Sequence, residues 1–216
     1  MIRAPFDVIA DALDPAGGGP QGRLALRSAE GIELPLEIGR WMGTPDVHEE
    51  RVLARAIPPV LDVGCGPARH TIALTRRGVG ALGLDVSRAV VRLASRRGAP
   101  VLQGSVFDPL PGRARWGTVL LLDGNVGIGG GPYRLMRRVR SLLRPGGRAL
   151  IELDSTESSL LRLLVRLTGA YGVAGERFAW AVVGLGMAHP LARSTGFHVQ
   201  ELWREGGRWF ASLDAV

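Results

Sequence analysis

The sequence has no lysine, one cysteine and few aromatic residues, which make up 6% of the chain. A single cysteine cannot form an internal disulfide, and Cys65 has no cysteine or histidine neighbour at the spacing of a metal site. We therefore predict no metal centre and interpret Cys65 as a small buried side chain. The N-terminus lacks a charged, apolar leader and no apolar run is long enough to cross a bilayer, so we expect a soluble, cytoplasmic protein with no membrane partner.

Charge is the next unusual property, because all 27 basic residues are arginine and the formal net charge is +7. Such an excess can mark a nucleic-acid surface, since phosphates are neutralised by clustered cations. Here the arginines fall on solvent-facing positions of predicted helices, as at Arg76, Arg92 and Arg137. We therefore expect no nucleic-acid partner.

Predicted strands and helices alternate through the middle of the chain. The sequence predicts strands at 60–63, 81–85, 101–103, 118–123 and 149–153, and helices at 68–77, after Ser87 and around 135–143, the last ended by Pro145-Gly146-Gly147. This alternation predicts one α/β domain with a doubly wound, mostly parallel sheet. Near the C-terminus, 197–203 and 209–213 flank Glu205-Gly206-Gly207, which predicts an antiparallel hairpin.

Two outer regions are less regular. Residues 24–28 and 32–37 predict a small hairpin, and Thr44-Pro45-Asp46 begins a helix with proline at an early helical position. Residues 160–167 are amphipathic and precede several aromatic side chains. We interpret 155–190 as a lid over the site, with a membrane or partner-helix role as the alternative.

The most informative pattern follows the first strand of the parallel set, where Asp62 precedes Gly64 and Gly66. Glycines let the main chain turn sharply and approach a ligand, and the free N–H groups of the next helix can bind an anion. Asp85 ends the neighbouring strand, where a carboxylate can accept hydrogen bonds from ribose hydroxyls. A dinucleotide fingerprint G-x-G-x-x-G would need a third glycine at Arg69, so a ligand with an amine, a carboxylate and a ribose fits better.

These residues resemble the first motif of the class I S-adenosylmethionine-dependent methyltransferases, roughly [D/E]-x-G-x-G-x-G, with Ala68 in place of the last glycine. Residues 142–148 resemble the family's L-[KR]-P-G-G segment, so that the resemblance spans 60–213. It implies a seven-stranded Rossmann-like sheet that ends in an antiparallel hairpin. It also implies a single domain made of an N-terminal substrate-side extension (1–57), a cofactor-binding core (58–154), the lid (155–190) and a C-terminal part (191–216).

The same resemblance implies a cofactor site for S-adenosylmethionine, with S-adenosylhomocysteine as product. Asp62 would orient the methionine amine through the turn and Asp85 would hold the ribose. The family's acidic residue after the third strand is replaced by Ser105, so adenine is expected at the Val106 N–H, with Asp108 either drawn into that role or a turn residue. The full expected set is Asp62, Gly64, Cys65, Gly66, Asp85, Val86, Ser105, Val106, Phe107, Asp123 and Gly124.

The acceptor side is less specified by the sequence. Methyl transfer is an in-line displacement that depends on alignment, with little or moderate help from a base. Asp123 and His70 are the candidate catalytic residues, as a positioning or proton-accepting carboxylate and as a base. Substrate contacts are expected from Trp41, Asn125, Tyr171, Arg177 and Trp180.

The chain lacks the [N/D]-P-P-[Y/F] motif of nucleic-acid and some protein N-methyltransferases after Asp123. We therefore expect a small-molecule methyltransferase that acts as a monomer or homodimer. The alternatives are an RNA methyltransferase, an NAD(P)-dependent Rossmann oxidoreductase and a non-catalytic cofactor-binding protein.

Overall fold

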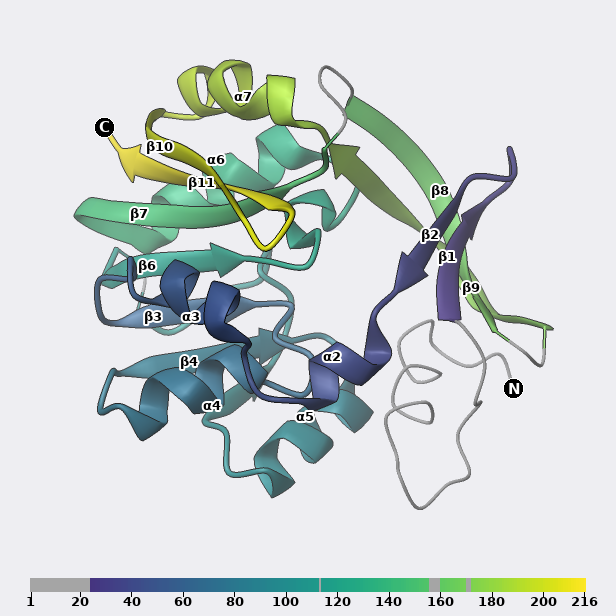
Figure 1. Cartoon of the computed structure of the whole chain (residues 1–216), viewed down its shortest axis with the longest axis horizontal. Coiled ribbons are helices and arrows are strands. Elements are labelled where there is room, and N and C mark those ends of the chain that lie inside the picture. The colour runs from purple at the N-terminus through teal and green to yellow at the C-terminus, as the bar shows by residue number, and fades with distance from the viewer. Residues whose placement is uncertain (1–23, 113, 156–159, 170–171) are drawn as a thin grey trace.

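The computed structural model describes residues 24–112, 114–155, 160–169 and 172–216, which form two β-sheets and their flanking helices (Figure 1). The larger sheet has seven strands in the order β10-β11-β7-β6-β3-β4-β5, and the smaller has four in the order β2-β1-β8-β9. The expected seven-stranded, Rossmann-like sheet with an antiparallel end is therefore confirmed. None of the described helices is long and apolar enough to span a membrane.

Five strands of the large sheet pair in parallel, β11 runs antiparallel to β7, and β10 runs antiparallel to β11. The parallel strands are β3 (Val60–Val63), β4 (Ala81–Asp85), β5 (Val101–Gln103), β6 (Trp116–Leu121) and β7 (Leu143–Leu153). The predicted C-terminal hairpin is β10 (Phe197–Glu205) and β11 (Arg208–Ala215), with β11 paired to β7. Since β4 and β6 flank β3, the strand order reverses beside β3, and such a switch point is where open α/β sheets bind ligands.

Helices cover both faces of this sheet because its central strands are apolar on both sides. In β6 and just after it, Val119 and Leu121 pack in one cluster while Leu120 and Leu122 pack in another. The first cluster includes α6 (Pro132–Leu142) and α7 (Ala188–Ser194), and the second includes α3 (Val47–Leu53) and part of α4 (Arg69–Arg76). Alternate residues of a strand face opposite ways, so a continuous apolar run predicts this two-sided burial.

Helix starts follow the capping residues of the sequence, with one correction. Ser87 accepts a hydrogen bond from the Val90 N–H at 3.2 Å at the start of α5 (Arg88–Arg96). Asp46 caps α3 in a capping box with Glu49. Pro45 therefore precedes the cap and lies outside the helix in which it was expected.

The Pro145-Gly146-Gly147 segment also differs from its expected role. Helix α6 ends at Leu142 and β7 begins at the next residue, so the segment lies inside the strand and does not separate helix from strand. A Cβ atom at Gly147 would lie 3.0 Å from the carbonyl oxygen of Trp116 and 3.1 Å from that of Gly117. The glycine therefore allows β7 to approach β6 closely where their register shifts.

The small sheet joins segments far apart in the sequence and lies beyond the carboxyl ends of β3, β4 and β6 (Figure 1). Its predicted hairpin is β1 (Leu24–Ser28) and β2 (Glu33–Leu36), and β1 pairs with β8 (Leu160–Gly169), which pairs with β9 (Gly172–Val183). The amphipathic stretch 160–167 is thus a strand whose residues Leu163, Val165 and Leu167 are buried. The short helix α2 (Ile38–Met42) connects β2 to the main body.

Candidate active site

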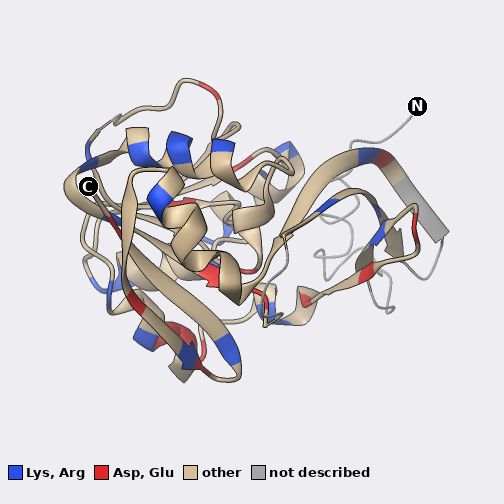
Figure 2. Ribbon diagram, turned by 90° about the horizontal axis from the view of Figure 1, so that it is seen from above, with Lys and Arg blue, Asp and Glu red and all other residues tan. Residues whose placement is uncertain are grey.

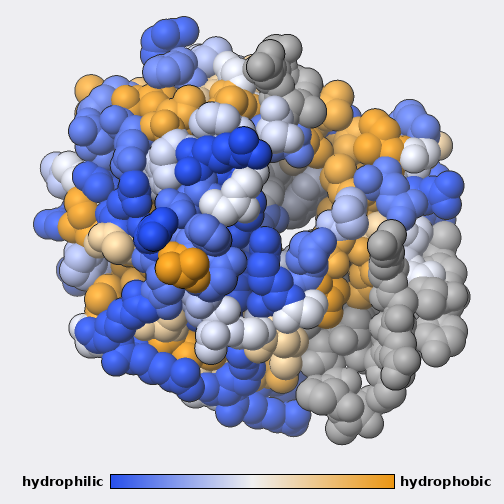
Figure 3. Space-filling model, in the orientation of Figure 1, coloured by the Kyte–Doolittle hydropathy of each residue, from blue (hydrophilic) through white to orange (hydrophobic). Residues whose placement is uncertain are grey.

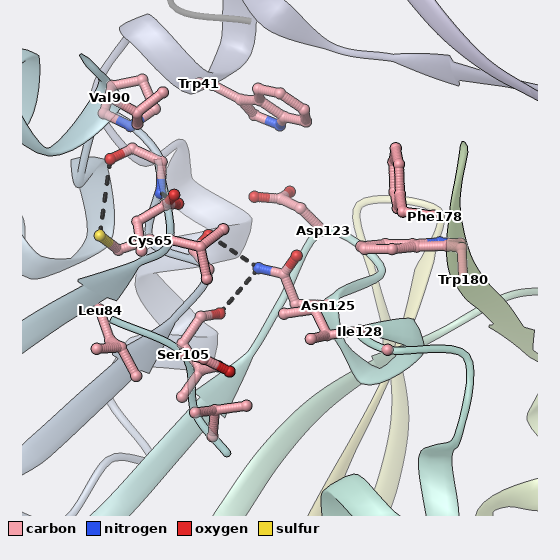
Figure 4. Close-up of a pocket in the computed structure, with 18 of the residues that line it drawn as sticks. Trp41, Cys65, Leu84, Val90, Ser105, Asp123, Asn125, Ile128, Phe178 and Trp180 are labelled. Atoms are coloured by element: carbon pink, nitrogen blue, oxygen red, sulfur yellow. Dashed lines mark hydrogen bonds between the residues drawn. The ribbon is translucent and has the colours of Figure 1, made fainter. Parts of the chain in front are cut away.

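A cavity lies between the carboxyl edge of the large sheet and the inner face of the small one (Figure 4). On this side of the molecule the surface is hollowed between the two parts (Figure 3). One wall consists of the turn after β3 and the ends of β4 and β5, and the other of α2, β1, β2 and β9. Residues from the core, the N-terminal segment and the segment after β7 therefore meet at one site.

The turn after β3 uses left-handed backbone at three positions, with φ of 70° at Gly64, 55° at Gly66 and 67° at Ala68. A Cβ atom at Gly64 would lie 2.8 Å from the Nδ2 atom of Asn125, so a side chain does not fit there. Ala68 adopts the conformation that glycine prefers at the start of α4. Ala68 therefore supplies a left-handed residue at the position where the motif that the sequence resembles has its last glycine.

Asn125, in the short helix η1 (Asn125–Gly127), holds this turn from the side of β6. Its Nδ2 atom donates hydrogen bonds to the carbonyl oxygens of Val63 and Gly64, both at 3.0 Å (Figure 4). The side chain also lines the cavity, as expected of a substrate contact. Its amide thus fixes the direction of two peptide groups at the switch point.

Two carboxylates meet the turn from different sides. Asp85 lines the cavity and accepts hydrogen bonds from the Gly66 N–H at 3.0 Å and the Ser87 N–H at 2.9 Å. Asp62 is 2% exposed, lies beneath the turn and accepts a hydrogen bond from Thr71 Oγ1 at 2.9 Å. Burial raises the pKa of both carboxyl groups above the usual value. Only Asp85 is placed to contact a ligand in the cavity.

Some of the other expected cofactor residues line the cavity and others lie outside it. Val86, Ser105, Val106 and Cys65 line the cavity, and burial raises the pKa of the Cys65 thiol well above its usual value. Phe107 and Gly124 are not among the lining residues. Phe107 stacks under the Arg134 guanidinium at 4.3 Å. Asp108 accepts a hydrogen bond from the Ser105 N–H at 3.2 Å, which is the turn role left open for it.

Asp123, after β6, lines the cavity but belongs to a cluster of charges. Its carboxylate lies 2.7 Å from Arg40 Nη2, 2.7 Å from Arg69 Nη2 and 3.2 Å from Arg208 Nη2. Burial raises the pKa of Asp123, but the nearby guanidinium of Arg69, with further cations, more than offsets burial and holds this pKa below its usual value. A carboxylate in this setting is a poor proton acceptor.

The cluster continues away from the cavity through two glutamates. Glu49 is 1% exposed and its Oε1 atom lies 2.7 Å from Arg69 Nη2 and 3.0 Å from Arg208 Nη1. Glu152 binds Arg208 at 2.5 Å and accepts a hydrogen bond from the Asp123 N–H at 2.6 Å. Arg40 belongs to the segment 40–42 that was expected to govern specificity, but four members of the cluster were not expected at a site, namely Arg69, Glu49, Glu152 and Arg208. They come from α4, α3, β7 and β11, and no local pattern links them.

Two of the expected acceptor-side residues, His70 and Arg177, are placed differently from Trp41 and Trp180, which line the cavity. His70 is buried, does not line the cavity and has its Nε2 atom 3.5 Å from Glu49 Oε1. A base role for His70 therefore has no geometric support, because its ring belongs to the charge cluster behind the cavity. Arg177 is exposed on β9 outside the cavity, since Phe178 and Trp180 occupy the inward positions. Tyr171 lies outside the described residues.

Comparison with known proteins agrees with this geometry. Residues 60–147 match the family model of a methyltransferase domain. A similar solved structure is a SAM-dependent methyltransferase from Bacteroides fragilis in complex with S-adenosyl-L-homocysteine, with 24% identity, a TM-score of 0.76 and coverage of 98% of this chain and 94% of that one.

Two other solved structures share the fold. One is the 1,6-didemethyltoxoflavin-N1-methyltransferase of Burkholderia thailandensis (19% identity, TM-score 0.60, 82% of each chain covered). The other is the CcbJ methyltransferase of Streptomyces caelestis (17% identity, TM-score 0.59, 82% of this chain and 92% of that one covered). At these identities the structures establish the fold, and the family model matches the segment that carries the glycine turn and Asp85. The match of residues 60–147 to a methyltransferase-domain model, together with the shared fold, supports a class I S-adenosylmethionine-dependent methyltransferase.

Proposed function

We propose that this chain transfers a methyl group to a small-molecule acceptor held in the cavity under the small sheet. The observation that supports this most directly is the composition of the cavity, which joins the glycine turn and Asp85 to aromatic side chains of α2 and β9. An acceptor bound there is enclosed between two sheets. Enclosure suits a small molecule better than a long polymer.

The residues present fit S-adenosylmethionine. Each oxygen of the Asp85 carboxylate receives one backbone N–H and has a further lone pair for a ribose hydroxyl. Apart from the two chain neighbours of Gly66, no described residue has an atom within 4 Å of where a Cβ atom at Gly66 would be, so the turn has open space for a ligand. Val86 and Val106 offer apolar contacts for adenine. When bound, the sulfonium supplies the electrophilic methyl group.

The protein contributes alignment and exclusion of water in this mechanism. Asn125 fixes the turn, and the charge cluster fixes Arg40 and with it the helix that carries Trp41. We assign Asp123 a positioning role, because three guanidinium groups make it a weak base. The bound acceptor would supply the lone pair for the transferred methyl group, and its proton would leave to water because Asp123 is a weak base.

Calorimetry with S-adenosylhomocysteine and with NADH tests the cofactor assignment. We expect S-adenosylhomocysteine to bind and NADH to give no heat above dilution. Turnover is then measured as release of S-adenosylhomocysteine across a metabolite panel. Binding of NADH without a response to the sulfur ligand would replace this proposal with an oxidoreductase. Cofactor binding without methyl transfer to any panel member would favour a non-catalytic protein.

A further inference from the structure

The acceptor half of the cavity is apolar and rich in aromatic rings. Leu26 and Leu36 come from β1 and β2, and Phe178 and Trp180 come from the inward face of β9. The two β9 rings are perpendicular with centroids 6.3 Å apart. Trp41 of α2 points into the same space across from them (Figure 4). A flat ring can therefore contact aromatic surface from two elements at once.

This half of the cavity offers no uncompensated charge among the described lining residues. The charged side chains that line the whole cavity are Arg69, Asp85 and Asp123. Asp85 lies on the cofactor side, and Arg69 and Asp123 bind each other at 2.7 Å. A charged acceptor would lose its hydration here without gaining a free counter-ion, which is costly in an apolar site.

A buried polar atom on the acceptor side lacks a hydrogen-bond partner among the residues that the structure describes. The indole Nε1 atom of Trp41 is buried and has no hydrogen-bond partner among the described residues. Buried tryptophan N–H groups usually donate a hydrogen bond, and an unmet donor costs free energy. In Figure 4 the nitrogen edge of this ring faces the space beside Asp123. An oxygen or nitrogen atom of the methyl acceptor in that space could accept a hydrogen bond from the Trp41 N–H group.

We infer that the methyl acceptor is an uncharged, planar aromatic molecule that packs among Trp41, Phe178 and Trp180 and accepts a hydrogen bond from Trp41 Nε1. The inference rests on the proposed function and specifies its substrate class. The nucleophilic atom is a ring nitrogen, amine or hydroxyl at the edge of the ring. Its lone pair forms the bond to the methyl carbon, the bond electrons return to sulfur, and the displaced proton goes to water.

Matched probes test the inference on full-length protein saturated with S-adenosylhomocysteine. Indole-3-carboxaldehyde is neutral and planar with a carbonyl acceptor, indole-3-carboxylate is its anionic counterpart, and cyclohexanecarboxaldehyde is neutral but not aromatic. Calorimetry is expected to show the neutral indole binding at least tenfold more tightly than either of the others. Equal or tighter binding of the carboxylate, or no binding of the neutral indole, would overturn the inference.

Two variants locate the probe. Trp41→Phe keeps a ring and removes the N–H, so it should weaken the neutral indole about fivefold, as expected for one neutral hydrogen bond. Trp203→Phe is the matched control, because the Trp203 Nε1 atom is also buried without a described partner but lies in another cluster. If both variants bind alike, Trp41 does not contact the probe. Binding of S-adenosylhomocysteine itself is measured first, so that failure of the proposed function is recognised separately.

Discussion

Asp85 is the single residue on which cofactor binding is expected to depend most. Its carboxylate faces the cavity while holding the Gly66 and Ser87 N–H groups. Asp85→Ala should weaken S-adenosylhomocysteine binding by about 1–3 kcal/mol, because charge-assisted hydrogen bonds to the ligand and to the turn are lost. Calorimetry measures this, with Asp214→Ala as control, since Asp214 pairs with Arg148 away from the cavity. Unchanged affinity in Asp85→Ala would show that the ribose is held elsewhere.

Gly64 and Ala68 share a left-handed backbone but should respond differently to substitution. Gly64→Ala should cost about 2 kcal/mol or more, since the added methyl group meets the Asn125 amide and the conformation is strained. Ala68→Gly should stay within about 1 kcal/mol of the natural chain. The relief of backbone strain is offset by two losses. A buried methyl group worth about 0.8 kcal/mol is removed, and glycine raises the conformational entropy of the unfolded chain.

Urea unfolding of the two variants checks this comparison. A Gly64→Ala chain as stable as the natural one would mean that Asn125 moves away without cost. Burial of its methyl group explains how alanine can occupy position 68, where the motif that the sequence resembles usually has glycine. The methyl group is fully buried in a cluster with Ile72 and Ala94, which compensates for the backbone strain.

At the scale of elements, Glu49 ties α3 to α4 and β11 through Arg69 and Arg208. Burial raises the pKa of Glu49, but the nearby His70 ring and Arg69 guanidinium more than offset burial and hold this pKa below its usual value. Its contribution to stability is therefore complete above the unfolded-state pKa of about 4.3 and is lost as the pH falls below it. Removing this carboxylate also leaves buried guanidinium groups unpaired, which costs about 3 kcal/mol near neutral pH.

Glu49→Gln should thus be about 3 kcal/mol less stable at pH 7, with a difference from the natural chain that shrinks by about 1.4 kcal/mol per pH unit below about pH 4.3. Urea unfolding from pH 7 to pH 3 measures it. The buried Asp62 and Asp85, whose pKa values shift the opposite way, are present in both chains and cancel in the difference. Glu176→Gln, at an exposed position of β9, is the control. A difference that stays constant with pH would contradict the charge role of Glu49.

The elements also differ in how far the sequence predicts them. The parallel strands and their helices were predicted because each has an apolar run ended by a cap or glycine, as at Ser87 and Gly98. The hairpins at 24–36 and 197–215 were predicted from their turns. The pairing of β1 with β8 was not predicted. Leu26 and Leu167 lie far apart in the chain, and no pattern in either strand indicates which strand it pairs with.

At the scale of the whole molecule, separation along the sequence also explains which parts of the site could be predicted. Gly64, Gly66 and Asp85 belong to a contiguous segment, and their placement at the switch point follows from the parallel fold. The ion pairs of Asp123 could not be predicted in this way. They are made by three of the 27 arginines, and nothing in the sequence around these three shows that they are the ones that face Asp123. His70 was favoured as a base for its closeness in sequence to the turn, yet its side chain points to Glu49.

The net charge of +7 gives a prediction for the molecule as a whole. Basic positions are spread over the helices and both sheets (Figure 2), and Arg40, Arg69 and Arg208 are occupied by carboxylates within the fold. Retention on single-stranded RNA should therefore be weak, with a log–log salt slope of about 2 or less instead of the steep slope of a protein with 6–10 phosphate contacts. A steep slope would revive the RNA methyltransferase alternative.

The way the small sheet is assembled has a consequence for how this protein can change during evolution. Its four strands come from both sides of the core segment, so the wall proposed to contact the acceptor and the wall proposed to hold the cofactor are encoded in separate stretches of the gene. Mutations in 24–42 and 160–183 can remodel the acceptor wall while 60–106 keeps the cofactor turn intact. Selection for a new acceptor can therefore act on one wall without loss of the methyl donor.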